Sequence, residues 1–190
     1  MTVNEAPASN STLVRRLRVA IAVLALLAAG LVLWAALGGE DDDSGESSPG
    51  QARVVSAAEL GALAEDAPGP LYWAGERSGT ELEYDEADGG RLYVRYLTEG
   101  AEAGDPRPVF LTIGTYPLAD AVAALRANAK RTGSELLEAK GSGAVVWANP
   151  DSPTSVYLAE PGAAYQVEVY DPSPRRALTL ALSGDVVPAP

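Results

Sequence analysis

The chain of 190 residues contains neither cysteine nor histidine. Without cysteine there can be no disulfide, thiolate metal site, thiol nucleophile or lipid-modified cysteine. Without histidine the commonest general base and the commonest zinc ligand are missing, and with them the Ser-His-Asp and Cys-His types of active site. No motif predicts a catalytic residue, a cofactor or a metal, so we expect a protein that is not an enzyme.

Positive charge is also scarce, with 14 lysines and arginines against 26 acidic residues and a formal net charge of -12. Phosphate recognition needs clustered lysine and arginine, so this balance argues against a nucleic-acid partner. The charge is unevenly spread. Arg15, Arg16 and Arg18 make the start of the chain basic, whereas residues 40–46 hold acids and no base.

One long apolar run, residues 19–37, carries no charge. As a helix rising about 1.5 Å per residue it matches the hydrocarbon core of a bilayer, about 30 Å thick. We predict a single transmembrane helix whose partner is the lipid bilayer. The arginines before it place the N-terminus in the cytoplasm and the C-terminal domain outside. A signal peptide cleaved near Gly38 is the alternative, although the run is longer than a usual signal core of about 7–15 residues.

The remaining chain divides by composition. Residues 1–18 are expected to be a cytoplasmic tail, residues 38–52 an acidic flexible linker, and residues 53–187 one extracytoplasmic domain. Within that domain we predict an α+β fold, in which about three helices cover a mostly antiparallel sheet of hairpins. The element order, four strands and then a helix, recurs in residues 71–132 and 135–183, which predicts a duplicated ββββα unit.

Local signals mark the domain's first helix and its clearest hairpin. Ser56 and Glu59 have the spacing of a capping box, which begins a helix. Residues 80–86 and 91–97 alternate between apolar and polar side chains, as half-buried strands do. Cross-strand charge pairing favours a loop at residues 87–89, with Tyr84 opposite Leu92, Leu82 opposite Val94, Asp85 opposite Arg91 and Glu81 opposite Arg95. The last three residues, 188–190, are expected to fray.

Aromatic and acidic residues gather early in this domain. Rings can pack on the apolar faces of sugars while carboxylates accept hydrogen bonds from hydroxyl groups. The candidate ligand platform consists of Tyr72, Trp73, Tyr93, Glu81 and Glu83. The competing interpretation is structural, because Tyr93 suits an ordinary exposed strand position.

Several stretches resemble uncharacterised bacterial single-pass membrane-anchored proteins with a small α+β extracytoplasmic domain. They are residues 92–97 (LYVRYL), 104–108 (GDPRP), 112–117 (TIGTYP) and 168–174 (EVYDPSP). The resemblance implies placement at the cell envelope and no particular activity. We therefore expect a membrane-tethered, non-catalytic binding or interaction module, whose partner is a cell-envelope polymer or protein. The alternatives are a carboxylate-dependent cell-envelope hydrolase and a small-ligand or lipid carrier.

Overall fold

The computed structural model describes residues 52–190. The predicted tail, transmembrane helix and most of the linker lie outside these residues. Among the helices that the structure describes, none has both the length and the apolar character needed to cross a membrane.

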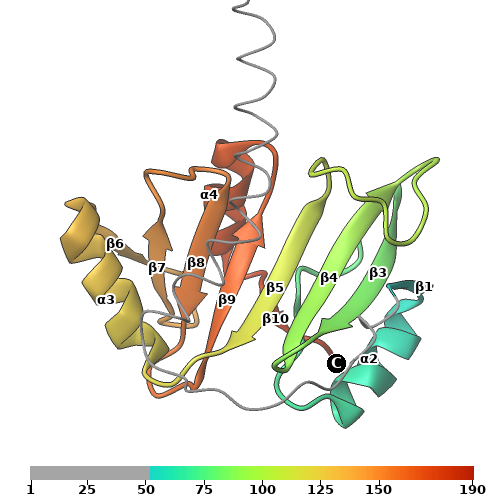
Figure 1. Cartoon of the computed structure of the whole chain (residues 1–190), viewed down its shortest axis with the longest axis horizontal. Helices are drawn as coiled ribbons and strands as arrows, with labels where there is room; N and C mark the ends of the chain where they lie inside the picture. The colour runs from blue at the N-terminus through green and yellow to red at the C-terminus, as the bar shows by residue number, and fades with distance from the viewer. Residues whose placement is uncertain (1–51) are drawn as a thin grey trace, which may run out of the picture. The chain divides into compact units, whose positions relative to one another are not determined.

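The described domain is α+β, and its centre is an eight-stranded antiparallel sheet (Figure 1). The strand order is β1-β3-β4-β5-β9-β8-β7-β6, and a separate two-stranded ribbon pairs β2 with β10. The strands are β1 (Arg53–Val55), β2 (Tyr72–Trp73), β3 (Thr80–Ala87), β4 (Arg91–Thr98), β5 (Leu111–Pro117), β6 (Leu136–Glu138), β7 (Val145–Ala148), β8 (Ser155–Ala159), β9 (Tyr165–Tyr170) and β10 (Val187–Pro188). The helices are α2 (Ala57–Asp66), α3 (Ala121–Thr132) and α4 (Pro174–Ser183).

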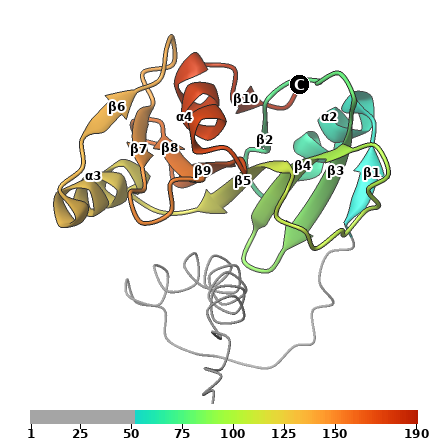
Figure 2. The ribbon, with the colours of Figure 1, turned by 90° about the horizontal axis from the view of Figure 1, so that it is seen from above.

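The two faces of the sheet are covered differently (Figure 2). On the first face lie α2, the β2–β10 ribbon and α4, which bury the main hydrophobic core. On the second face lies α3, which packs on β6, β7, β8 and β9 around a smaller cluster. The alternation of side chains along each strand sends Val146 into the first core and Trp147 into the second. Helix α3 thus covers the half of the second face that β6 to β9 form.

The local helix signals behave as the sequence predicts. The Ser56 side chain accepts a hydrogen bond from the Glu59 amide at 3.2 Å, and Glu59 accepts from the Ser56 amide at 2.7 Å. The capping box at the start of α2 is therefore confirmed. Gly133 ends α3 in the left-handed conformation (φ 67°), where glycine has no steric penalty.

The predicted register of the β3–β4 hairpin is wrong by two residues. Tyr84 lies opposite Val94, Leu82 opposite Tyr96, Asp85 opposite Tyr93 and Glu83 opposite Arg95. The loop is three residues long as predicted, but it occupies residues 88–90, because Gly89 (φ 74°) and Gly90 (φ 71°) both adopt the left-handed conformation. The shift keeps every side chain on its predicted face and changes which charges meet.

The C-terminal residues do not fray. Val187 and Pro188 pair with Trp73 and Tyr72, and the Ala189 amide donates to the Leu71 carbonyl at 2.7 Å. These contacts lie far apart in sequence, so no local pattern indicates them.

The order of four strands and then a helix does recur, as β2 to β5 before α3 and β6 to β9 before α4. The two helices nevertheless pack on opposite faces of the sheet. The duplication stays a prediction.

Candidate functional site

A row of tyrosines and carboxylates crosses the middle of the second face. Backbone pairing aligns Asp85 on β3 with Tyr93 on β4, Gly114 on β5, Glu168 on β9 and Tyr157 on β8. We call this set, together with Tyr116 from β5, the tyrosine row. It lies between α3 at one side and the loop of residues 99–110 at the other.

Tyr116 occupies the space above Gly114. A side chain at Gly114 would place its Cβ 2.8 Å from the Tyr116 hydroxyl and 3.0 Å from two ring carbons. The absence of that side chain lets the ring lie across the strand, so that its hydroxyl donates to Glu168 Oε2 at 2.6 Å. Tyr93 meets the same ring edge-on, with centroids 5.8 Å apart and an interplanar angle of 84°. Such pairs contribute roughly 0.5–1.5 kcal/mol beyond the area they bury.

At the other end of the row, Tyr157 stacks on Trp147, with centroids 5.6 Å apart and an interplanar angle of 24°. Trp147 is itself held by a hydrogen bond from its Nε1 to Ser134 Oγ at 2.8 Å. The tyrosine row is therefore anchored to the cluster beneath α3 and has a rigid end.

Burial and neighbouring carboxylates shift the protonation of these groups. Burial and then the Glu168 carboxylate raise the pKa of Tyr116 and of Tyr157, so both phenols stay protonated at all ordinary pH values. Burial first and the Glu83 carboxylate second raise the pKa of Asp85, while Arg95 lowers it in part. The row thus combines neutral phenols with carboxylates in a partly dry environment.

Three buried polar atoms of the described residues have no hydrogen-bond partner, and strand alternation puts all three on the second face. They are Asp85 Oδ1, Ser155 Oγ and Gln166 Oε1. Gln166 lies directly opposite Tyr116, and Ser155 is two residues from Tyr157 on the same strand. An unpaired buried polar atom costs free energy, so these three atoms lower the stability of this face.

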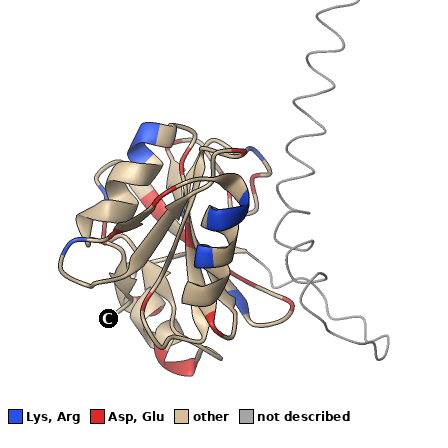
Figure 3. Cartoon of the chain, turned by 90° about the vertical axis from the view of Figure 1, so that its left-hand side faces the viewer, with Lys and Arg blue, Asp and Glu red and all other residues tan. Residues whose placement is uncertain are grey.

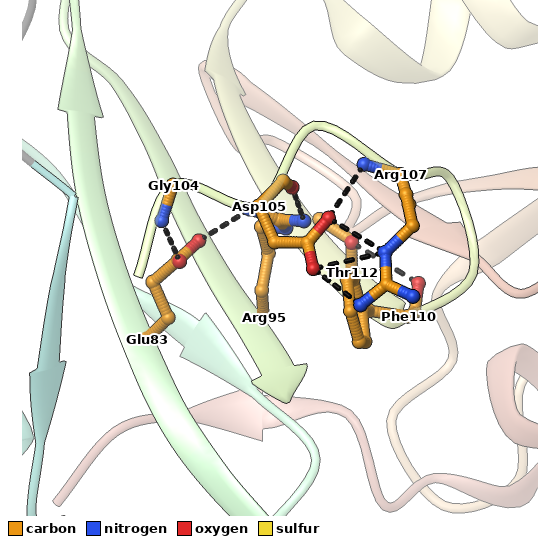
Figure 4. A network of polar contacts seen from close by, with 7 residues as sticks. All are labelled: Glu83, Arg95, Gly104, Asp105, Arg107, Phe110 and Thr112. Carbon is orange, nitrogen blue, oxygen red and sulfur yellow. Dashed lines mark hydrogen bonds and ion pairs between the residues drawn. The ribbon is translucent and has the colours of Figure 1, made fainter. Parts of the chain in front are cut away.

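The loop of residues 99–110 covers one end of this face (Figure 4). Glu83 accepts from the Gly104 amide at 2.6 Å and from Arg95 Nη1 at 2.7 Å. Arg95 also donates to the Asp105 carbonyl at 2.6 Å and stacks over the Phe110 ring, 5.2 Å from its centroid. This network closes the loop onto β3 and β4.

Arg107 adds an outer layer to the same loop. Its guanidinium and amide hydrogen bonds lower the pKa of Asp105 to about 2. Arg107 is the exposed partner and keeps 61% of its side-chain surface, whereas Asp105 keeps 12%. It orders the loop surface and leaves the tyrosine row untouched.

The structure does not bring the five residues of the predicted platform together. Tyr72 and Trp73 belong to β2 on the first face, where the Tyr72 hydroxyl contacts Glu160 Oε1 at 3.0 Å and the Tyr165 hydroxyl at 2.9 Å. Glu83 is 1% exposed and committed to Arg95. Glu81 lies exposed near the start of β3, and Tyr93 alone joins the tyrosine row.

Sequence reasoning missed Tyr116, Tyr157 and Glu168. The alternation in residues 165–170 does predict that Glu168 points away from the main core. The sequence does not show that β5 pairs with β9, because about fifty residues separate the two strands. This pairing is what puts Glu168 opposite Gly114. Gly114, two residues before Tyr116 and so on the same face of β5, was the one available signal.

Two carboxylate pairs on this face bear on catalysis. Asp85 and Glu168 are three strands apart, about 14 Å at the usual strand spacing, whereas glycosidase pairs lie about 5–9.5 Å apart. Asp85 and Glu83 lie two residues apart on the same face of β3, but Glu83 is ion-paired with Arg95 and bonded to the Gly104 amide. Within residues 52–190 there is also no group of acidic residues that could hold a metal ion.

Basic side chains gather elsewhere (Figure 3). Helix α3 carries Arg126, Lys130 and Arg131, and α4 begins with Arg175 and Arg176, neither helix containing an acid. Because the two helices lie on opposite faces, these charges form two separate groups. That the protein has no nucleic-acid partner stays a prediction from its net charge.

Comparison with known proteins adds no relative: no family model, curated protein or solved structure matches this chain.

Proposed function

We propose that this protein is a single-pass membrane protein whose outer domain binds a component of the cell envelope without transforming it. Residues 19–37 anchor it, the N-terminus lies in the cytoplasm, and residues 38–52 tether the domain. The apolar length of the anchor and its flanking arginines support this placement. Cleavage near Gly38 would instead release the domain.

We base the proposed binding function on the tyrosine row. Its partly buried tyrosine rings offer apolar surface beside the carboxylates of Asp85 and Glu168, and its β3 to β5 part lies on strands that α3 does not cover. Carbohydrate recognition uses this combination, because sugar rings have apolar faces and a rim of hydroxyl donors. A polyhydroxylated envelope polymer is therefore the ligand that the site fits best.

A hydrolase of the same polymer is the second candidate, and Asp85 is the observation that favours it. A carboxyl group with a raised pKa is what a general acid requires. The second carboxylate is the difficulty, since Glu83 is bonded to Arg95 and Glu168 lies about 14 Å away. Turnover of wall polymer by the purified full chain, lost in Asp85→Asn, would establish the hydrolase and contradict the non-catalytic proposal.

Membrane placement is tested by fractionating cells that express the full chain. After alkaline carbonate extraction we expect the protein in the membrane pellet, and protease added to intact spheroplasts should digest the C-terminal domain. A soluble product beginning near Gly39 would show cleavage, and protection from protease would overturn the orientation.

Binding is tested by co-sedimentation of the detergent-solubilised full chain with insoluble envelope polymer. We expect the wild type in the pellet and Tyr93→Ala largely in the supernatant. The control is Val187→Ala, which truncates an exposed apolar side chain on β10, on the other side of the sheet. Equal sedimentation of both variants would remove the tyrosine row as the binding site.

A further inference from the structure

We propose that β6, the last strand at one end of the sheet, pairs with β6 of a second copy of this chain, so that the two sheets become continuous (Figure 1). The two strands run antiparallel about a twofold axis at Leu137. The inference goes beyond the proposed function, from which it takes only the membrane anchor. It follows from the free backbone groups of β6, from one exposed leucine and from the charges beside the strand.

The hydrogen-bond pattern shows which backbone groups of β6 are free. The Ala139 amide donates to the Ala144 carbonyl at 2.9 Å, so Leu137, two residues earlier, also turns its amide and carbonyl toward β7. The amides and carbonyls of Leu136 and Glu138 therefore point away from the sheet. Among the described residues, no loop or helix end bonds to these backbone groups. An edge strand of this kind is a template for pairing with another chain.

The open part of this edge is short. Before it, the Ser134 amide is bonded to a carbonyl at the end of α3, at 3.0 Å. Beyond it, the Lys140 amide is bonded to the Leu182 carbonyl of α4, also at 3.0 Å. A long extended peptide would run into the end of α4 there. β6 itself has three residues and lies between a helix and a turn, so a second copy of β6 matches the opening.

The two free residues fix the register of this pairing. Leu136 of one copy exchanges both N–H···O bonds with Glu138 of the other, and the symmetric pair does the same. Any other antiparallel register would leave one of the two residues without this exchange. The two Leu137 residues then lie directly opposite each other, in the type of pair where side chains are closest. Leu137 is 39% exposed in the single chain, and the contact covers it.

Charges beside the strand are complementary in the same register. Leu136 packs against the cluster under α3, and it follows the basic end of this helix, where Lys130 and Arg131 lie exposed. Glu138 of the other copy lies opposite Leu136 on the same face, and so beside that basic end. Among the described residues, none of the three charged side chains forms an ion pair within its own chain. Pairing of two copies would give each Glu138 a cationic neighbour.

The contact is small, so in free solution it would be weak. The proposed anchor strengthens it, because two chains confined to one bilayer meet at a raised effective concentration. Strand partners keep their side chains on the same face, so the second faces of both copies look to the same side. Two anchored domains can therefore present the same face together.

The lack of native cysteine makes the pairing directly measurable. The two Leu137 Cα atoms would be about 4.5 Å apart, within the disulfide range of about 4.4–6.8 Å. Leu137→Cys in the full chain should therefore cross-link two differently tagged copies in membranes when a mild oxidant is added. The matched control is Val54→Cys, because Val54 is a 46% exposed residue of β1, the strand at the other end of the sheet. We expect Leu137→Cys to cross-link at least about tenfold faster.

Further variants test the register and the charges, with thermal unfolding as the check that each domain is folded. Glu138→Cys should cross-link slowly, because the two Glu138 residues would be diagonal neighbours, about 7–8 Å apart. In the Leu137→Cys background, Glu138→Lys should slow the cross-link about fivefold, since two exposed ion pairs are lost. Adding Lys130→Glu and Arg131→Glu reverses the charge on α3 and should restore the rate.

Each other result counts against the proposal. Equal rates for Leu137→Cys and Val54→Cys would overturn pairing at β6, and a fast cross-link in Glu138→Cys would overturn the register. A disulfide from Leu137→Cys to a different protein, with none between the tagged copies, would overturn the second copy as the partner. Carbonate extraction and polymer co-sedimentation do not depend on these rates, so failure of the proposed function is distinguished from failure of this contact.

Discussion

At the scale of single residues, the second face is held by one buried ion pair. Glu83 and Arg95 face each other because the β3–β4 register brings them opposite, and the Gly104 amide of the loop of residues 99–110 donates to the buried Glu83 carboxylate. Burying two charges costs several kcal/mol unless both are well paired, so removing one partner is much worse than removing both.

Replacing Arg95 with methionine should lower the free energy of unfolding by about 3 kcal/mol, because Glu83 would remain buried without its counter-charge. Chemical unfolding followed by circular dichroism measures this. Arg107→Met is the matched control and should change stability little, since its ion pair is exposed. Equal effects of the two changes would contradict the structural role of Glu83.

Replacing Gly114 should disturb the tyrosine row more than it lowers the stability of the fold. In Gly114→Ala the new Cβ would collide with the Tyr116 ring, which can swing away because it is the end of a flexible side chain. We expect a loss of stability of about 1–2 kcal/mol, together with loss of the Tyr116–Glu168 hydrogen bond. Near-ultraviolet circular dichroism should report the displaced ring, and polymer binding should fall in parallel. An unchanged aromatic spectrum would contradict the geometry of the row.

Asp85 should make stability depend on pH. Its pKa is raised above the usual 3.8, so the folded state binds the proton more tightly than the unfolded chain. That stabilisation is fully present below the unfolded pKa and is lost as the pH rises through the folded pKa. Asp85→Asn, which stays neutral, should therefore gain stability relative to the wild type between acid and neutral pH. Unfolding curves of both proteins at pH 3 and pH 7 measure this gain. The same difference in stability at the two pH values would contradict it.

At the scale of elements, close packing of α4 against the β6–β7 hairpin depends on one glycine. Gly184 ends α4 with φ 83°, and a Cβ there would run into the Lys140 carbonyl, whose own amide donates to the Leu182 carbonyl at 3.0 Å. Both sides of this contact are backbone, so neither can yield by changing a rotamer.

Gly184→Ala should therefore destabilise the domain by about 3 kcal/mol or more, combining left-handed strain with a backbone clash. Gly162→Ala is the control, because it has nearly the same φ (81°) and open space around its Cβ position. It should cost only about 1 kcal/mol. Thermal unfolding of the two variants separates conformational strain from packing, and similar losses would mean that the contact with Lys140 is unimportant.

Helix starts and strand faces are the elements that a short sequence window can predict. The capping box of α2 and the alternation of β3, β4 and β9 follow from contacts within a few residues of one another. The register of the β3–β4 hairpin depends on which glycine ends its loop. Cross-strand charge pairing alone predicted the wrong partners. The actual register exchanges a surface pairing of Glu81 for the buried pairing of Glu83.

At the scale of the whole molecule, the C-terminal residues close the main core. Val186 is 9% exposed, Ala189 bonds to Leu71, and the Pro190 carbonyl lies 2.7 Å from where a Cβ on Gly61 would be. The first helix of the described domain and its last residues are thus packed together, although over a hundred residues separate them.

Deleting residues 186–190 should lower the free energy of unfolding by about 2–3 kcal/mol, through the loss of one buried valine and of the β10 hydrogen bonds. It should also expose Tyr72 and Leu71, which denaturant titration and dye binding would detect. Gly61→Ala, which displaces the same tail through its backbone carbonyl, should produce a smaller loss in the same direction. An unaltered midpoint in the deletion would contradict the role of the tail.

Sequence alone determined the properties that depend on composition or on neighbouring residues. The lack of cysteine and histidine removed whole classes of chemistry, and the periodicity predicted an α+β domain with a mostly antiparallel sheet, which the structure bears out. Only the tertiary structure decided which strands are neighbours. The pairing of β4 with β5 and of β5 with β9 brings Tyr93, Tyr116 and Glu168 together on the second face. These contacts join residues far apart in the chain, and their free energy depends on the whole fold.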